Sequence, residues 1–336
     1  MTIVIDGFGG DNAPTEVVKG VVQALSEFHA PDLFLMVTGD EQKLRKVFSD
    51  LSIDPDGGRI KIVNAEGVMR VEDNPTDIRT SKSGTSMGVA LNLVKKGEAD
   101  AMVSAGSTAA LMVGGTMVVG RIKGIKRPAL SPIMPASGDS PYILLDGGSN
   151  LECRPEMLLQ FGIMGSIYMN RIMRITSPRV GLLNIGTEEE KGRELEKEAF
   201  KLFTARKSES LNFIGNVEAR EIPLGACDVV VTDGFTGNLV LKAVEGMGVY
   251  MKQSLKDLFG KNAATKVGYL LTKRGVMDIR RKTDYREIGG APLLGTAKPV
   301  IKAHGSSDAK AFKNAIKQAI DFVHSGAIKE IEENIQ

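Results

Sequence analysis

Short apolar runs alternate with longer segments of helical periodicity along nearly the whole chain. Apolar runs of this length are typical of strands that helices cover on both faces. The runs are Ile3–Asp6, Leu33–Gly39, Ile60–Asn64, Ala101–Ala105, Tyr142–Asp146, Arg179–Gly186, Leu211–Gly215 and Asp228–Asp233. The other segments predict helices at Pro14–Phe28, Glu41–Ser49, Ser86–Lys96, Thr108–Arg121, Glu156–Met173, Glu190–Arg206, Asn238–Phe259 and Asp308–Ser325.

This alternation predicts parallel strands that are joined by right-handed helical crossovers. We therefore expect an α/β fold with a doubly wound, mostly parallel sheet. Only 5% of the residues are aromatic and none is Trp, so aliphatic side chains must fill the core. No Pro-, Ser- or Gly-rich linker divides residues 1–336, which predicts a single compact α/β unit with room for two lobes.

Charge, cysteines and histidines exclude several classes of protein. A net charge of +2 gives no general attraction to nucleic acid. Cys153 and Cys227 lie far apart and predict reduced, buried thiols, and 3 scattered histidines give no metal-ligand spacing. The opening Met1–Asp6 segment is typical of a strand rather than a signal peptide, and no apolar run approaches the ~18 residues of a membrane span. The sequence predicts a cytoplasmic protein without metal or cofactor.

Ligands of doubly wound folds bind at the carboxyl ends of the strands, and small polar residues follow almost every strand of this chain. In the first such loop, glycines can turn backbone N–H groups toward an anion in front of a helix. The spacing matches neither a Rossmann fingerprint nor a Walker A loop, and a tight turn without ligand is the alternative. The candidate binding residues of this loop are Asp6, Gly9, Gly10 and Asn12.

The second and third loops have the same character. Small hydroxyl residues at a helix start suit a phosphate or a carbonyl oxygen, although a helix N-cap would also explain them. The candidates are Ser104, Gly106, Ser107 and Thr108 in the second loop, and Asp146 and Asn150 in the third.

The fourth, fifth and sixth loops add charged and amide groups. Lys191, near a strand end, is a candidate partner for phosphate or an oxyanion, whereas His304 is as readily structural as substrate-binding. The other candidates are Asn184 and Gly186 in the fourth loop, Asp233, Gly234, Gly237 and Asn238 in the fifth, and Gly305 and Ser306 in the sixth.

Two basic features lie outside these loops. Arg79 and Lys82 suit phosphate or phosphopantetheine, although a solvated loop is equally consistent with them. Within the region 249–286, the stretch Lys252–Arg274 carries six Lys or Arg residues against one Asp, and apolar residues recur at helical spacing. This basic amphipathic region predicts contact with a membrane, an acidic carrier protein or a dimer mate, and packing on its own core is the alternative.

Taken together and in this order, the loops resemble those of the phosphate acyltransferases of the PlsX family, over nearly the whole chain. Each motif alone is weak, but the set is specific. The motifs are Asp6-Gly-Phe-Gly-Gly-Asp-Asn-Ala-Pro14, Ser104-Ala-Gly106, Asp233-Gly-Phe-Thr-Gly-Asn238, Gly289-Gly-Ala-Pro-Leu-Leu-Gly295 and Lys302-Ala-His-Gly-Ser-Ser307.

The resemblance implies a fold similar to that of isocitrate and isopropylmalate dehydrogenases and of phosphotransacetylases. It also implies transfer of a fatty acyl group from acyl-acyl carrier protein to inorganic phosphate, giving acyl phosphate and free carrier protein for phospholipid synthesis. Family members are homodimers that supply a membrane acyltransferase. The resemblance therefore predicts a homodimer with peripheral contact at the inner face of the cell membrane.

In this reaction phosphate is already anionic, so the demanding step is to hold two anions together and to stabilise a tetrahedral oxyanion. Loop N–H groups and Lys191, with Arg79 or Lys82, are expected to offset that charge. Asn238 is expected to orient the thioester carbonyl, and His304 or Lys191 to protonate the leaving thiol. The scheme needs no covalent intermediate.

Two positions depart from the family pattern. Ser107-Thr108-Ala109 stands where family members usually have Asn-Thr-Gly, and Ser149-Asn150 stands where they have Ala-Asn. If the family's Asn contacts substrate, Ser107 contacts it differently. Both changes keep small residues, so we expect activity to be retained.

Three other functions stay open at this stage. A dehydrogenase is compatible with the fold and would give an absorbance change with NAD or NADP and a hydroxy acid. A phosphotransacetylase would use acyl-CoA, whereas the basic region favours a protein carrier. A scaffold without chemistry has no need of so many glycine-rich strand ends.

Overall fold

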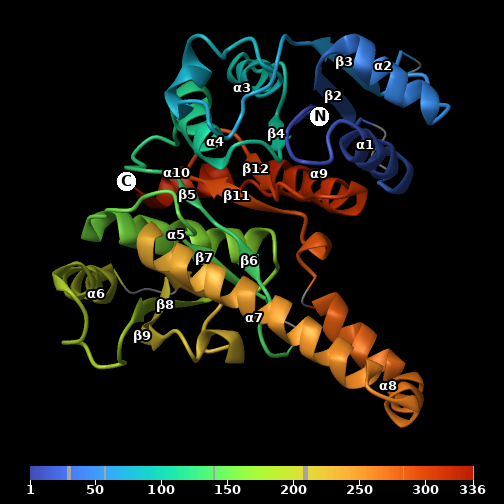
Figure 1. Ribbon diagram of the computed structural model, residues 1–336. Coiled ribbons are helices and arrows are strands. Elements are labelled where there is room, and N and C mark those ends of the chain that lie inside the picture. The colour runs from blue at the N-terminus through green and yellow to red at the C-terminus, as the bar shows by residue number, and fades with distance from the viewer. Residues whose placement is uncertain (29–31, 57, 139–140, 207–210, 283, 336) are drawn as a thin grey trace.

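The computed structural model describes residues 1–28, 32–56, 58–138, 141–206, 211–282 and 284–335, and its strands form two sheets (Figure 1). The first has the order β3-β2-β1-β4-β12-β11-β5. Its strands are β1 (Thr2–Asp6), β2 (Phe34–Gly39), β3 (Ile60–Asn64), β4 (Ala101–Ser104), β5 (Ala129–Leu130), β11 (Gly290–Leu294) and β12 (Val300–Ala303). Strands β3, β2, β1, β4 and β12 are parallel, whereas β11 is antiparallel to both of its neighbours.

The second sheet has the order β6-β7-β10-β8-β9, and only β6 is antiparallel to its neighbour. Its strands are β6 (Ile133–Met134), β7 (Tyr142–Leu145), β8 (Arg179–Asn184), β9 (Asn212–Glu218) and β10 (Val229–Val231). Ser131 and Pro132 alone separate β5 of the first sheet from β6 of the second. The chain thus passes between the sheets in a very short step.

Helices surround both sheets, as the repeated crossovers require. The α-helices are α1 (Thr15–Glu27), α2 (Glu41–Asp50), α3 (Ser86–Lys95), α4 (Thr108–Gly114), α5 (Pro155–Arg171), α6 (Glu194–Arg206), α7 (Gly234–Gly260), α8 (Ala263–Lys282), α9 (Ala309–His324) and α10 (Ala327–Ile335). Single turns are η1 (Pro75–Arg79), η3 (Ile222–Leu224), η4 (Tyr285–Glu287) and the π-helical η2 (Gly115–Val119), which continues α4. Among the described residues, no helix is both long and apolar enough to cross a membrane.

The main hydrophobic core is shared by the two sheets. It contains Ile5 of β1 and Val231 of β10, both fully buried. Helices α5 and α9 join across it: the Gln318 side-chain amide donates to the Tyr168 hydroxyl at 3.0 Å, and the Tyr168 ring meets Phe322 edge-on at 5.4 Å. Aliphatic side chains dominate this core, as the shortage of aromatic residues requires.

The fold class agrees with the prediction of a doubly wound, mostly parallel α/β protein, with its strands divided between two sheets. The expected strands all form, with end points shifted by a few residues. Helix α7 begins at Gly234 rather than at Asn238, and α6 at Glu194 rather than at Glu190. Strands β5, β6 and β11 and helices α8 and α10 were not predicted, and the division into lobes stays a prediction.

Candidate active site

The carboxyl ends of β1, β4 and β12 are adjacent in the first sheet, so the first, second and sixth loops meet there. The Asp11 backbone N–H donates to the Gly305 carbonyl at 2.8 Å, and the Asn12 side-chain amide donates to the Ser306 carbonyl at 3.2 Å. Gly10 has a φ of +96°, and a Cβ there would lie 2.8 Å from the Gly305 oxygen. Glycine is therefore required where these two loops touch. We call this meeting of three loops the first loop group.

A buried chain of hydrogen bonds runs through the first loop group. The Ser104 hydroxyl donates to Asp6 Oδ2 at 2.7 Å and accepts from the Gly106 N–H at 3.1 Å. A Cβ on Gly9 would lie 2.6 Å from Asp6 Oδ2 and 2.7 Å from the Gly106 nitrogen. Burial raises the pKa of Asp6, while the hydrogen bonds that it accepts from the Ser104 hydroxyl and the Phe8 N–H oppose that rise.

Lys302, which the sequence analysis did not select, reaches into the same group. Its Nζ donates to the Ala105 carbonyl at 3.1 Å and to the Ala303 carbonyl at 2.6 Å. Burial lowers the pKa of Lys302 to about 8, and the charges of Asp6 and Asp11 act against this fall. A lone lysine in a short strand is usually a solvated position, so only its place at the start of the sixth loop could have marked it.

The second loop group lies at the carboxyl ends of β7, β10 and β8, which are adjacent in the second sheet. Its centre is Asp146, which is fully buried. The Asp146 carboxylate accepts from the backbone N–H groups of Ser149 at 2.9 Å and Asn150 at 2.7 Å, and from the Asn150 side chain at 2.9 Å. Burial raises the pKa of Asp146, and these donors oppose the rise. Asp146 and Asn150 thus fix the third loop.

The fifth loop packs directly on the third. The Gly234 N–H donates to the Asn150 carbonyl at 2.8 Å, and a Cβ on Gly237 would lie 1.9 Å from the Asp146 carbonyl oxygen. Asp233 caps α7 by accepting from the Thr236 N–H at 2.7 Å. Asn238 is exposed and lies beside Gly148 of the third loop. Asn238 is therefore placed to meet a ligand at the surface of this group.

The fourth loop borders the second group through Arg193, another residue that the sequence analysis missed. The Arg193 guanidinium pairs with both Asp233 and Glu196. Asn184 holds the loop closed, because its side-chain amide donates to the Lys191 carbonyl at 3.0 Å. The Lys191 side chain packs beside Gly186 and is exposed. Arg193 has no motif signal, since an Arg at a helix start opposes the helix dipole and is typical of a solvated position.

Helix α4 connects the two loop groups. It begins at Thr108, directly after the second loop, with Ser107 as its N-cap accepting from the Ala110 N–H at 3.4 Å. Further along α4, the Met112 sulfur accepts from the Ser149 hydroxyl of the third loop at 3.3 Å. The same Ser149 hydroxyl accepts from the Leu130 N–H at 2.7 Å. The two loop groups are therefore linked through a single short helix.

Three predicted residues lie at the rim. The exposed His304 ring is 2.8 Å from the Ser306 hydroxyl through Nδ1. Lys82 forms an ion pair with Asp73 at 3.1 Å, and Arg79 is exposed at the end of η1. The structure therefore brings most of the predicted residues into the two groups, whereas Arg79 and Lys82 lie at the end of and after η1, which packs against α4.

Cys153 lies beside the second loop group and is half-buried, whereas Cys227 is fully buried as predicted. The Cys153 thiol donates to the Asn150 carbonyl at 3.6 Å. Burial raises the pKa of Cys153 to about 12, so the thiol stays protonated at neutral pH and is a poor nucleophile. Within the described ranges, no group of three His, Cys, Asp or Glu side chains is arranged to hold a metal ion.

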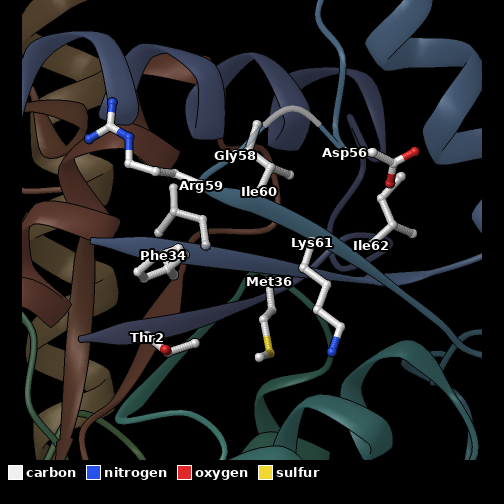
Figure 2. A pocket seen from close by; sticks show the side chains of 10 residues that line it. Thr2, Phe34, Met36, Asp56, Gly58, Arg59, Ile60, Lys61 and Ile62 are labelled. Carbon is white, nitrogen blue, oxygen red and sulfur yellow. The ribbon is translucent and has the colours of Figure 1, made fainter. Parts of the chain in front are cut away.

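One surface pocket lies elsewhere (Figure 2). It is lined by Thr2, Phe34 and Ile60, which begin β1, β2 and β3, together with neighbours such as Met36 and Lys61. These are the amino-terminal ends of the strands, at the edge of the sheet away from the loops described above. The pocket is therefore separate from the candidate site.

Comparison with known proteins decides the family. A family model described as a fatty acid synthesis protein matches residues 1–330. The phosphate acyltransferase of Caldanaerobacter subterraneus subsp. tengcongensis is 47% identical over 336 residues, which cover 100% of this chain and 98% of the relative. The phosphate acyltransferase of Alkaliphilus oremlandii is also 47% identical, over 100% and 97% of the two chains. The chain belongs to the PlsX family of phosphate acyltransferases.

Membership of this family confirms the resemblance that the motifs indicated. As a PlsX-family member, the protein is an acyltransferase of fatty acid and phospholipid synthesis whose reaction involves an acyl donor and phosphate.

Solved structures with the same fold include two phosphotransacetylases. The enzyme from Streptococcus pyogenes has a TM-score of 0.61 at 19% identity and covers 98% of this chain and 94% of its own. The EutD phosphotransacetylase from Staphylococcus aureus has a TM-score of 0.60 at 17% identity, over 97% and 93% of the chains. At this identity the likeness establishes the doubly wound fold that this PlsX-family chain shares with them.

Proposed function

We propose that the protein transfers a fatty acyl group from the thioester of acyl-acyl carrier protein to inorganic phosphate, which gives acyl phosphate and free carrier protein. The observation that carries the proposal is the pairing of two loop groups through α4. Each group joins a buried carboxylate, glycines in close backbone contact and exposed polar groups. One group can hold phosphate while the other holds the thioester, as a two-substrate transfer requires.

In the proposed reaction a phosphate oxygen forms a bond to the thioester carbonyl carbon, and the carbon–sulfur bond then breaks. The electron pair of that bond leaves with sulfur, which takes up one proton to become the free thiol. Because phosphate is already an anion, the site needs positive charge and N–H donors more than it needs a strong base. No cysteine attacks in this scheme, which agrees with the raised pKa of Cys153.

We assign phosphate to the first loop group. Gly9, Gly10 and Gly106 let three loops pack closely around the start of α4, and a helix start that follows glycine loops is suited to an anion. The other candidate binding residues of this group are Asp6, Asn12, Ser104, Ser107, Thr108, Gly305 and Ser306. Exposed Arg79 adds positive charge on the approach of the anionic donor, and Lys82 can do so if the donor replaces its partner Asp73.

We assign the thioester to the second loop group. Exposed Asn238 orients the carbonyl, while Asp146, Asn150, Asp233, Gly234 and Gly237 hold the loop beneath it. Asn184 and Gly186 place the exposed Lys191 at the neighbouring strand end. Lys191 offsets oxyanion charge, and His304 or Lys191 donates the proton to the leaving thiol.

The region 249–286 is the proposed contact surface for partners; its Thr283 lies outside the described residues. Figure 1 shows α7 and α8 projecting together from the body. Apolar side chains are exposed along both helices, among them Tyr250, Leu258, Leu270 and Leu271. We propose that the protein is a cytoplasmic homodimer with peripheral contact at the inner membrane face, and that this hairpin is the surface that contacts the dimer mate, the membrane or the acidic carrier protein.

The test compares donors. Purified protein is mixed with palmitoyl-acyl carrier protein or palmitoyl-CoA, with and without phosphate, and the release of free thiol is followed. The proposal predicts phosphate-dependent release that is faster from the carrier protein. Equal or faster release from palmitoyl-CoA would indicate a phosphotransacetylase instead. No release from either donor would contradict both of these functions.

A further inference from the structure

The Ala105–Gly106 peptide is held at both ends by groups from different strands. Its carbonyl accepts from Lys302 Nζ at 3.1 Å, and its N–H donates to the Ser104 hydroxyl at 3.1 Å. Ser104 in turn donates to Asp6 Oδ2 at 2.7 Å. The ends of β12, β4 and β1 therefore converge on a single peptide of the second loop.

The glycine turn of the first loop rests directly on this peptide. A Cβ on Gly9 would lie 2.7 Å from the Gly106 nitrogen, and a Cβ on Gly10 would lie 2.9 Å from the Ala105 Cβ. Only short side-chain atoms, Ala105 Cβ, Asp6 Oδ2 and Ser104 Oγ, lie at this contact, and none of them ends a long flexible side chain that could absorb a displacement. A shift of the Ala105–Gly106 peptide must therefore displace the turn that we assign to phosphate.

The charges around Lys302 are unbalanced toward the negative. Asp6 and Asp11 both act on its ammonium, whereas β4, the loop to Ser107, and β11 carry no titratable side chain. The other charged groups at this end of β12 are engaged elsewhere: Asp308 with Arg286, Lys310 with Glu287, Glu16 with Lys19 and His304 with Ser306. Among the described residues at this end of β12, Lys302 is thus a cation placed to offset Asp6 and Asp11.

We propose that Lys302 is a positioning residue for phosphate: its ammonium fixes the Ala105–Gly106 peptide beneath the glycine turn and cancels the negative field of Asp6 and Asp11. This inference rests on the proposed function, because it takes phosphate as the ligand of the first loop group. A neutral Lys302 keeps N–H donors for the two carbonyls but loses the charge. Phosphate binding therefore depends on the protonation of Lys302.

The test compares phosphate dependence in Lys302→Gln, which keeps a donor without the charge, and Lys302→Arg, which keeps the charge. Lys298→Gln is the matched control, because Lys298 is exposed just before the opposite end of β12. We expect Lys302→Gln to raise the KM for phosphate about tenfold or more, the usual scale for losing a buried charge-assisted contact. The KM for the acyl donor, and all constants of Lys298→Gln, should change by less than about threefold.

The pH profile separates this role from a merely structural one. Burial lowers the pKa of Lys302 to about 8, so the wild-type KM for phosphate should rise as the pH increases through that value. In Lys302→Gln the KM for phosphate should be high at every pH. In Lys302→Arg it should be low and should not change with pH, since Arg keeps its charge. A rise at the same pH in Lys302→Arg, or a Lys302→Gln protein that matches Lys298→Gln, would overturn the proposal.

Two further measurements keep the outcomes distinct. Circular dichroism and sedimentation show whether Lys302→Gln is folded; if it is not, Lys302→Arg and the wild-type pH profile decide. Calorimetric titration with inorganic phosphate compares the phosphate affinities of the wild type and the Lys302 variants without turnover. Phosphate that binds with the expected Lys302 and pH dependence, but without acyl transfer, would contradict the proposed function while leaving this inference intact.

Discussion

At the residue scale, several glycines serve close backbone contact rather than turns. Gly234 and Gly237 were predicted to belong to a loop before the helix, yet they form the first turn of α7. They pack against the Asp146–Asn150 loop so closely that any side chain would collide with it. Sequence spacing identified them as part of a site, but it could not indicate a helix, because glycine is a poor helix former and normally marks its end.

Gly237→Ala should destabilise the protein and disturb the third loop. The new Cβ would lie 1.9 Å from the Asp146 carbonyl oxygen, a backbone atom that no rotamer change can move. We expect a loss of about 3 kcal/mol or more in the free energy of unfolding, at the upper end for overpacking. Urea denaturation measures it.

Gly246→Ala in the same helix is the matched control, since nothing lies within 4 Å of its added Cβ. It should be stabilised by about 0.5–1 kcal/mol, as expected for an exposed helical glycine. Equal stabilities of the two variants would show that α7 does not sit on the third loop as described.

Cys153→Ser should keep its activity. The thiol lies beside the second loop group, but burial raises its pKa to about 12 and no step of the proposed reaction uses it. We expect kcat to stay within about threefold of the wild type, because serine retains the donor toward the Asn150 carbonyl. A folded variant that loses more than about a hundredfold in kcat would instead indicate a covalent acyl-enzyme.

At the element scale, the sequence predicted the strands that have long apolar runs and missed those without them. β11 contains Gly290 and Pro292, residues that argue against an inner strand, and β5 and β6 have only two residues each. α8 was predicted only as a basic amphipathic region, because its apolar residues have no core to face in this chain. Tertiary pairing, rather than local pattern, determines each of these elements.

The exposed apolar side chains of α7 and α8 can be tested by a single substitution. Leu271 on α8 is 83% exposed, and Leu224 on η3, at 74%, is an equally exposed control outside the hairpin. Leu271→Glu should weaken self-association or binding to anionic vesicles, since it places a charge in an apolar contact. Sedimentation velocity and co-flotation with phosphatidylglycerol vesicles measure the two effects separately.

Loss of the dimer alone would assign this face to the second copy, and loss of flotation alone would assign it to lipid. Leu224→Glu should change neither. If Leu271→Glu also behaved as the wild type in both measurements, the hairpin would not be the partner surface that we propose.

At the scale of the whole molecule, the six strand-end loops were predicted from sequence, but their gathering into two separate loop groups was not. Loops after β1, β4 and β12 meet because these strands are neighbours in one sheet, although residues 6 and 304 are far apart in sequence. Strand order is not encoded in local pattern, so the two groups and the link through Met112 appear only in the fold. Lys302 and Arg193 were missed for the same reason, since their partners lie on other elements.

In the proposed reaction, phosphate itself attacks the acyl carbon. The most direct measurement incubates the wild-type protein with palmitoyl-acyl carrier protein and phosphate labelled with ¹⁸O at every oxygen, and analyses the products by mass spectrometry. The expected product is palmitoyl phosphate that retains all of the label and forms in step with free carrier thiol. Unlabelled palmitate that forms without any palmitoyl phosphate, or thiol release that does not depend on phosphate, would mean that water is the acceptor and would exclude the proposed transfer.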